Sequence, residues 1–152
     1  MKSPPLCRRP ARLTMLALAA LLPAACSALA PPTPSSPFIG SWTNPDRQLV
    51  GFRDDAIVLT PPNEPPTPMS LQTCDGTYRF AYGEKGRDAL LALTPRQPDL
   101  RRELTGLLVQ PTYPVAEVNC GEGYSAYVLL NDHDMVVIHR DRDIAGLERL
   151  SR

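Results

Sequence analysis

The chain has 152 residues, and its 16 lysine and arginine residues are balanced by 16 aspartate and glutamate residues. A chain without net charge lacks the basic excess of a nucleic-acid-binding domain, so we expect no nucleic-acid partner. The roughly 110 residues that follow a proline-rich stretch near the N-terminus suffice for one domain with one core, and are too few for two.

The N-terminus has the pattern of an export signal. Residues 1–12 contain four basic side chains and no acidic one, and the apolar run LTMLALAALL follows at residues 13–22. A basic segment before an apolar run of this length is typical of a secretory signal, and the run is too short to span a membrane. We therefore predict a signal peptide over residues 1–25. Its removal leaves a net charge of −4, which argues against a polybasic membrane-binding patch.

Two cleavage sites compete after this run. Cleavage after Ala30, in the A-x-A sequence 28–30, would leave Pro31 at the new N-terminus, where proline generally blocks the ordinary signal peptidase. The sequence LPAAC, which ends at Cys26, resembles the lipobox of bacterial lipoproteins, with Pro23 where leucine is usual. This resemblance implies a lipid on Cys26 and, with Ser27 next, an outer-membrane protein that faces the periplasm. A soluble periplasmic protein cleaved near Ala30 is the alternative.

The cysteine count agrees with a lipid anchor. Cys7 lies in the signal peptide, so the exported chain keeps Cys26, Cys74 and Cys120. If Cys26 carries the lipid, Cys74 and Cys120 remain as a pair in an oxidising compartment, where a disulfide is expected. That disulfide would close a loop of 47 residues and stabilise the fold by about 4 kcal/mol. A reactive cysteine is the alternative, although no C-x-x-C motif is present.

The rest of the chain divides into a linker and a β domain. Residues 26–37 combine the predicted lipid-anchor cysteine with a Pro/Ser-rich spacer, and residues 38–152 form the domain. Short alternating segments separated by turn signals predict an all-β domain, a single small antiparallel β-barrel or sandwich of about 8–10 short strands. Five prolines in 61–68 predict a surface loop. We expect strands at 38–43, 49–53, 56–60, 76–83, 89–94, 104–109, 113–120, 125–130 and 135–140, and a strand or short helix at 144–150.

The first expected strand contains Gly40-Ser41-Trp42. This G-x-W sequence resembles the first strand of lipocalins and related small calycin-like barrels. The resemblance implies that Trp42 plugs the closed end of a barrel and that an arginine from a late strand stacks over it. Arg140, at the end of MVVIHR, is the expected partner, and Arg149 is the other option. An ordinary core tryptophan is the alternative.

A second segment, LQTCDGTYRFAYG, resembles the Y-x-C-x-G strand opening of membrane-bound lysozyme inhibitors, with Gln72 where that pattern has tyrosine. The later W-x-K-G segment of that family is missing, so its inhibitory loop is not carried over. Tyr78, Phe80 and Tyr82 share one face of this segment, and we expect them to fill the interior. We therefore predict a non-enzymatic exported lipoprotein that binds an envelope protein through its loops, in an inhibitor-like manner. A lipocalin-type carrier of a small hydrophobic ligand is the alternative.

Signatures of catalysis, metals and cofactors are missing from the sequence. The segment NDHDMVVIHRDRD at 131–143 holds His133 and His139, but the first lies in an expected turn and the second six residues along a strand, about 20 Å away. GYSAY at 123–127 lacks the second glycine of a nucleophile elbow. The chain contains no phosphate-binding or dinucleotide-binding glycine motif. We therefore expect no enzymatic activity, no metal site and no cofactor.

Overall fold

The computed structural model describes residues 36–69, 77–94, 96–142 and 144–152. These residues belong to one compact unit, 32–152. The predicted signal peptide, Cys26, most of the linker and Cys74 lie outside the described residues. Within the described ranges, no helix is both long enough and apolar enough to cross a membrane.

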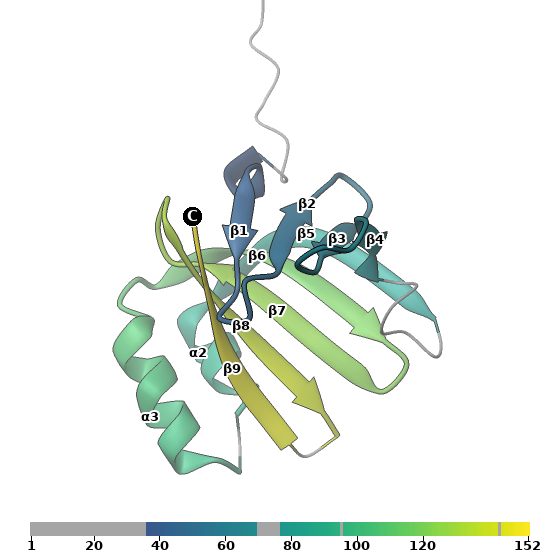
Figure 1. Cartoon of the computed structure of the whole chain (residues 1–152). Helices are drawn as coiled ribbons and strands as arrows, with labels where there is room; N and C mark the ends of the chain where they lie inside the picture. The colour runs from purple at the N-terminus through teal and green to yellow at the C-terminus, as the bar shows by residue number, and fades with distance from the viewer. Residues whose placement is uncertain (1–35, 70–76, 95, 143) are drawn as a thin grey trace, which may run out of the picture. The chain divides into compact units, whose positions relative to one another are not determined.

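A single antiparallel sheet of nine strands dominates the domain, which confirms the all-β prediction (Figure 1). Its spatial order is β4-β3-β2-β1-β9-β8-β7-β6-β5. The edge strands β4 and β5 do not pair with each other, so the sheet is not closed into a barrel. The strands are β1 (Ser41–Thr43), β2 (Leu49–Phe52), β3 (Ile57–Thr60), β4 (Thr67–Pro68), β5 (Tyr78–Gly86), β6 (Thr112–Cys120), β7 (Gly123–Leu129), β8 (Asp134–Asp141) and β9 (Ile144–Ser151).

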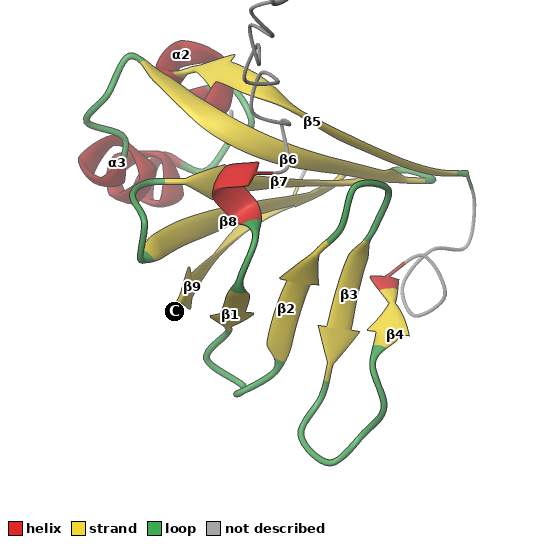
Figure 2. Ribbon diagram, turned by 90° about the horizontal axis from the view of Figure 1, so that it is seen from above, coloured by secondary structure: helices red, strands yellow, loops and turns green. Residues whose placement is uncertain are grey.

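The sheet bends so that β1–β4 face the concave side of β5–β9 (Figure 2). Successive side chains of a strand point to opposite faces, so alternate apolar residues of β6–β9 point to this side. Together with Phe38 and apolar residues of the first three strands they form one core, which we call the concave core. Its buried members are Phe38, Trp42, Val50, Phe52, Ile57, Leu59, Ala116, Val118, Tyr127, Leu129, Met135, Val137 and Leu150.

Two helices, α2 (Arg87–Leu91) and α3 (Pro98–Leu107), lie against the other face of the sheet (Figure 1). Their buried leucines pack against β6–β8. The strands expected at 89–94 and 104–109 are therefore wrong. Pro98 occupies the first turn of α3, where its fixed φ favours a helix, and Asp99 beside it complements the helix dipole. Leu104 and Leu108 are four residues apart and both fully buried, which is the spacing of a helix face.

Smaller differences concern three other segments. Residues 36–38 form a 3-10 helix before β1, so the first strand is shorter than expected. Residues 144–151, ambiguous in sequence, form strand β9. The proline-rich loop at 61–68 ends in the two-residue strand β4, which lies at the sheet edge, where proline is tolerated.

Candidate functional site

One end of the concave face is closed around Trp42. The indole is fully buried, and its Nε1 donates a hydrogen bond of 2.9 Å to the carbonyl oxygen of Phe38. The guanidinium of Arg152 stacks over the indole, with its carbon 4.2 Å from the ring centroid. Arg152 also donates to the carbonyl oxygens of Ile39 at 2.8 Å and Asp132 at 2.5 Å. Arg152 thus joins the segment before β1 to the β7–β8 turn.

The expected stacking of Arg140 on Trp42 is wrong. Arg140 is exposed, and its Nε donates to the carbonyl oxygen of Arg142 at 3.2 Å. Strand β8 alternates so that Arg140 shares the helix-covered face with Val136 and Ile138, away from Trp42. Arg149, the other option, pairs with Glu103 of α3 at 3.8 Å.

Gly40 makes the approach of Arg152 possible. Its backbone φ of +140° is one that residues other than glycine rarely adopt. A Cβ added at this position would lie 2.7 Å from Nη1 of Arg152. The glycine of the G-x-W sequence therefore leaves room for the arginine that covers the tryptophan.

Aromatic rings fill the space beside Trp42. Phe38 contacts Phe52 and Tyr82 with ring centroids 5.3 Å apart, and Phe52 meets Tyr127 edge-on at 5.4 Å. Tyr78, Phe80 and Tyr82 all pack against the concave core, as the sequence predicted. The hydroxyl of Tyr82 donates to the carbonyl oxygen of Arg53 at 2.6 Å. Burial, reinforced by the charge of Asp54, raises the pKa of Tyr82 to about 12.

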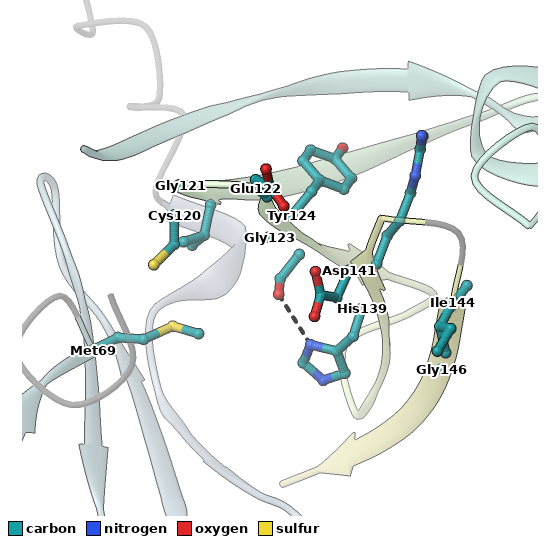
Figure 3. A pocket seen from close by; sticks show the side chains of 14 residues that line it. Met69, Cys120, Gly121, Glu122, Gly123, Tyr124, His139, Asp141, Ile144 and Gly146 are labelled. Atoms are coloured by element: carbon teal, nitrogen blue, oxygen red, sulfur yellow. Dashed lines mark hydrogen bonds between the residues drawn. The ribbon is translucent and has the colours of Figure 1, made fainter. Parts of the chain in front are cut away.

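At the opposite end, the described residues leave the concave face open. A pocket of about 660 Å³ lies between the β6–β7 hairpin, the β8–β9 hairpin and Met69, the residue after β4 (Figure 3). Val118, Ala145 and Ile144 contribute apolar surface, and Ile144 is 72% exposed at the rim. Arg142 and Glu122, from the two hairpin tips, form an ion pair of 2.6 Å, so the tips are tied to each other.

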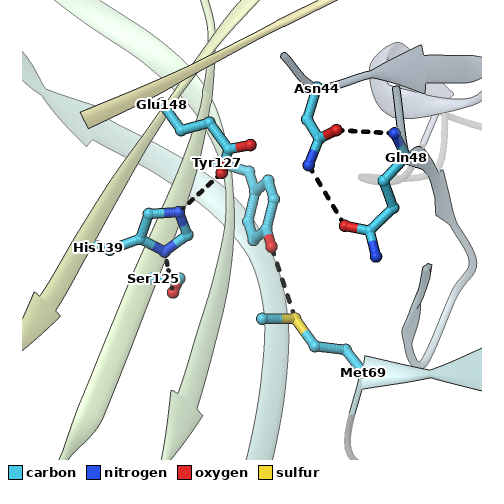
Figure 4. A network of polar contacts seen from close by, with 7 residues as sticks. All are labelled: Asn44, Gln48, Met69, Ser125, Tyr127, His139 and Glu148. Atoms are coloured by element: carbon cyan, nitrogen blue, oxygen red, sulfur yellow. Dashed lines mark hydrogen bonds and ion pairs between the residues drawn. The ribbon is translucent and has the colours of Figure 1, made fainter. Parts of the chain in front are cut away.

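Three polar side chains from neighbouring strands form a chain of hydrogen bonds at this open end (Figure 4). Oγ of Ser125 lies 2.9 Å from Nδ1 of His139, and Nε2 of His139 lies 3.2 Å from Oε2 of Glu148. Ser125 and His139 are direct partners in the β7–β8 register, and both line the pocket. Sequence reasoning considered Ser125 only as part of an incomplete elbow and did not consider Glu148. The alternation of β7, β8 and β9 was the available signal for both.

The two histidines lie at opposite ends of β8. His133 precedes the strand in an exposed turn, in which Oδ1 of Asn131 accepts hydrogen bonds from the backbone N–H groups of His133 and Asp134. This is the Asx-type turn expected for NDHD. Among the residues that the structure describes, no group of three or more His, Cys, Asp or Glu side chains could hold a metal ion.

Cys120 ends β6 and lines the pocket. It stands opposite Tyr78 in the β5–β6 register, and the backbone N–H of the next residue, Gly121, donates to the carbonyl oxygen of Thr77. Cys74 precedes Thr77 by three residues but lies outside the described residues, so its pairing with Cys120 stays a prediction.

No family model matches the chain, and searches of curated proteins and of solved structures find no match either. The resemblances to lipocalins and to lysozyme inhibitors therefore rest on the quoted residues alone.

Proposed function

We propose that this chain is an exported lipoprotein, anchored through Cys26, whose β domain binds an envelope protein through an exposed hairpin. Since removal of residues 1–25 leaves a net charge of −4, the membrane contact in this proposal is the lipid and not a basic surface. The bacterial periplasm, reached from an outer-membrane anchor, is the proposed location.

The observation that carries the proposal is the filled interior. Rings of Phe38, Phe52, Tyr82 and Tyr127 occupy the space between the two halves of the sheet. A lipocalin-type carrier holds its ligand in the corresponding space, and eight-stranded barrels of that type leave room for one small ligand. This packing supports recognition of a partner at the surface of the domain.

The β3–β4 hairpin offers the most suitable surface. Residues 62–66 are all exposed, and three of them are prolines. The hairpin returns to the sheet through β4, where Leu59 pairs with Thr67 and Val58 with Pro68. Proline restricts the backbone before a partner binds, so less conformational entropy is lost on docking.

A photo-crosslinking amino acid placed at Glu64 tests this proposal in intact cells. We expect a discrete covalent adduct with one envelope protein, which mass spectrometry identifies. The matched control places the same amino acid at Arg102, an exposed position on α3 with 80% side-chain exposure, and should give no such adduct. Absence of an adduct at position 64, or identical adducts at both positions, would contradict binding through this hairpin.

A carrier of a small hydrophobic ligand is the second candidate, and the open pocket beside Met69 and Ile144 favours it. The stacking of Arg152 on Trp42 after Gly40 is also similar to the arrangement that the lipocalin resemblance implies, with a different arginine. A hydrophobic dye distinguishes the candidates. Saturable micromolar binding that Gly146→Trp abolishes would favour the carrier, because Gly146 lines the pocket.

The proposed anchor has its own test. Cys26→Ser should move the protein from the membrane fraction to the soluble periplasm and abolish incorporation of a fatty-acid analogue. An unchanged distribution would instead favour cleavage near Ala30.

A further inference from the structure

The open pocket contains the parts of a nucleophilic site. From the chain of hydrogen bonds Ser125–His139–Glu148, we propose that Ser125 is a nucleophile, that His139 is its general base and that Glu148 is the positioning residue of His139. The proposed substrate class is a carboxylic ester with a short acyl chain and a good leaving group.

Hydrogen-bond accounting fixes the direction of proton transfer. An ionised carboxylate only accepts hydrogen bonds, so Nε2 of His139 carries the proton that Glu148 accepts. In the neutral ring Nδ1 is then unprotonated, and the contact of 2.9 Å makes the Ser125 hydroxyl the donor. This is the protonation state in which an imidazole can remove the hydroxyl proton, and both distances lie within the range for such groups.

The strands hold this geometry firmly. Ser125 and His139 are paired across the β7–β8 ladder, and His139 is paired with Gly146 of β9. Glu148 follows Gly146 by two residues, so its side chain lies on the same face. Sites built on strands are positioned more accurately than sites built on loops.

Ser125 is 9% exposed and lines the pocket together with His139. Beside His139, a Cβ added at Gly146 would meet no atom within 4 Å, so the pocket is open next to the imidazole. The His139 side chain is 41% exposed and lies in the same pocket as Ile144 (Figure 3). Val118 adds a second apolar side chain to the lining. A small acyl group fits the volume of about 660 Å³ and its apolar walls.

The reaction consumes the ester and one water molecule. Oγ of Ser125 attacks the carbonyl carbon while its proton moves to Nδ1 of His139. The bond to the leaving oxygen then breaks, the alcohol takes the proton, and the acyl group stays on Ser125. Water attacks this acyl-serine with His139 again as the base, which releases the carboxylic acid and restores the hydroxyl.

The position of Ser125 within strand β7 also limits the rate of ester hydrolysis. Strand β7 is paired on both sides, so its backbone N–H groups belong to the ladders and do not point at a developing oxyanion. Loss of one oxyanion donor costs a hydrolase about 10²–10³ in rate. We therefore expect turnover of activated aryl esters and not of amides.

The expectation of no enzymatic activity rested on motifs that are contiguous in sequence. Positions 125, 139 and 148 form no such motif and come together only through the register of three strands. That expectation remains a prediction, which the following experiment tests.

The full exported chain is treated with a small fluorophosphonate, and hydrolysis of p-nitrophenyl butyrate is followed in parallel. We expect the phosphonyl group on Ser125 by peptide mass spectrometry. His139→Gln should reduce labelling and hydrolysis at least tenfold, and Ser125→Ala should abolish both. The matched control is His133→Gln, which alters the other histidine in an exposed turn and should leave both signals unchanged.

Glu148→Gln separates positioning from simple structural support. Glutamine keeps an oxygen that accepts from Nε2 but no longer stabilises the charge of an imidazolium. We expect kcat to fall with little change in KM, and the rising limb of the rate–pH profile to move to lower pH. A residue with a merely structural role would leave the shape of that profile unchanged.

Two outcomes would overturn the proposal. One is folded wild-type protein without a label on Ser125 after prolonged treatment. The other is equal labelling of Ser125 in the wild type and in His139→Gln. Thermal melting of every variant shows whether a lost signal reflects lost chemistry or lost folding.

Discussion

The two ends of the concave face differ in what covers them. At the closed end, a guanidinium lies over a fully buried indole and donates to backbone carbonyls. At the open end, the imidazole of His139 contacts Ser125 and Glu148 but remains 41% exposed. Both ends belong to the same strands and follow the same alternation of side chains. A sheet face therefore becomes core or pocket according to what lies opposite.

Strand length explains the difference. Strands β1–β3 have three or four residues, whereas β6, β8 and β9 have eight or nine. At about 3.3 Å per residue, the short strands span about 10–13 Å and the long ones about 26–30 Å. Strands β1–β4 cannot cover the whole of β5–β9, so the described strands leave the hairpin ends of β6–β9 open.

The largest expected effect comes from emptying the closed end. Trp42→Ala removes a fully buried side chain and should lower the free energy of unfolding by about 3–5 kcal/mol. Ser125→Ala, at the open end, removes only a hydroxyl and should cost less than about 1.5 kcal/mol. Urea unfolding followed by circular dichroism measures both. Equal losses would mean that the two ends are packed alike.

The second largest loss of stability is expected from removing the predicted disulfide at the open end. If Cys120 pairs with Cys74, Cys120→Ala should lower the free energy of unfolding by about 2–4 kcal/mol. A reducing agent should destabilise the wild type by the same amount and leave the variant unaffected. Two thiols that titrate in the oxidised exported domain would contradict the pairing.

Most of the fold could be predicted from local patterns. Strand β8 was predicted within one residue at each end because its apolar residues lie between clear turn signals. Helices α2 and α3 were missed because the short leucine-rich segments ALLALT and LTGLLV suit either a strand or a buried helix face. Only their packing against β6–β8 decides between these structures.

The arginine stacked on Trp42 and the polar chain at the open end depend on contacts between residues distant in sequence. For this reason neither was predicted from the sequence. Arg152 reaches Trp42 because Ser151 pairs with both Thr43 and Asp134, and no local pattern reveals this double pairing. Ser125, His139 and Glu148 meet through register in the same way. The aromatic face of β5 was predictable because alternation within one strand is enough to show it.

A smaller difference in stability is expected between substitutions of Arg152, at the closed end, and of Arg140, near the open end. Arg152→Ala loses the stacking on Trp42 and charged hydrogen bonds to Ile39 and Asp132, so we expect a loss of about 1–3 kcal/mol. Arg140→Ala removes an exposed side chain and should change stability by less than about 0.5 kcal/mol. Thermal and urea unfolding of the two variants give the comparison. A larger loss for Arg140→Ala would instead favour Arg140 as the arginine that stacks on Trp42.

The smallest effect is a loss of stability in alkali, to which Tyr82, beside the closed end, should contribute. Burial raises the pKa of Tyr82 to about 12, above its ordinary value of 10, so the folded protein holds this proton more tightly than the unfolded chain. Its contribution is therefore complete below pH 10 and is lost as the pH rises from 10 towards 12. Tyr82→Phe also removes the hydrogen bond to Arg53 and should be less stable than the wild type at pH 8. Between pH 10 and 11, however, its free energy of unfolding should fall less steeply, because one titrating group is missing. Parallel slopes in urea unfolding at pH 8, 10 and 11 would mean that Tyr82 ionises as easily in the folded protein as in the unfolded chain.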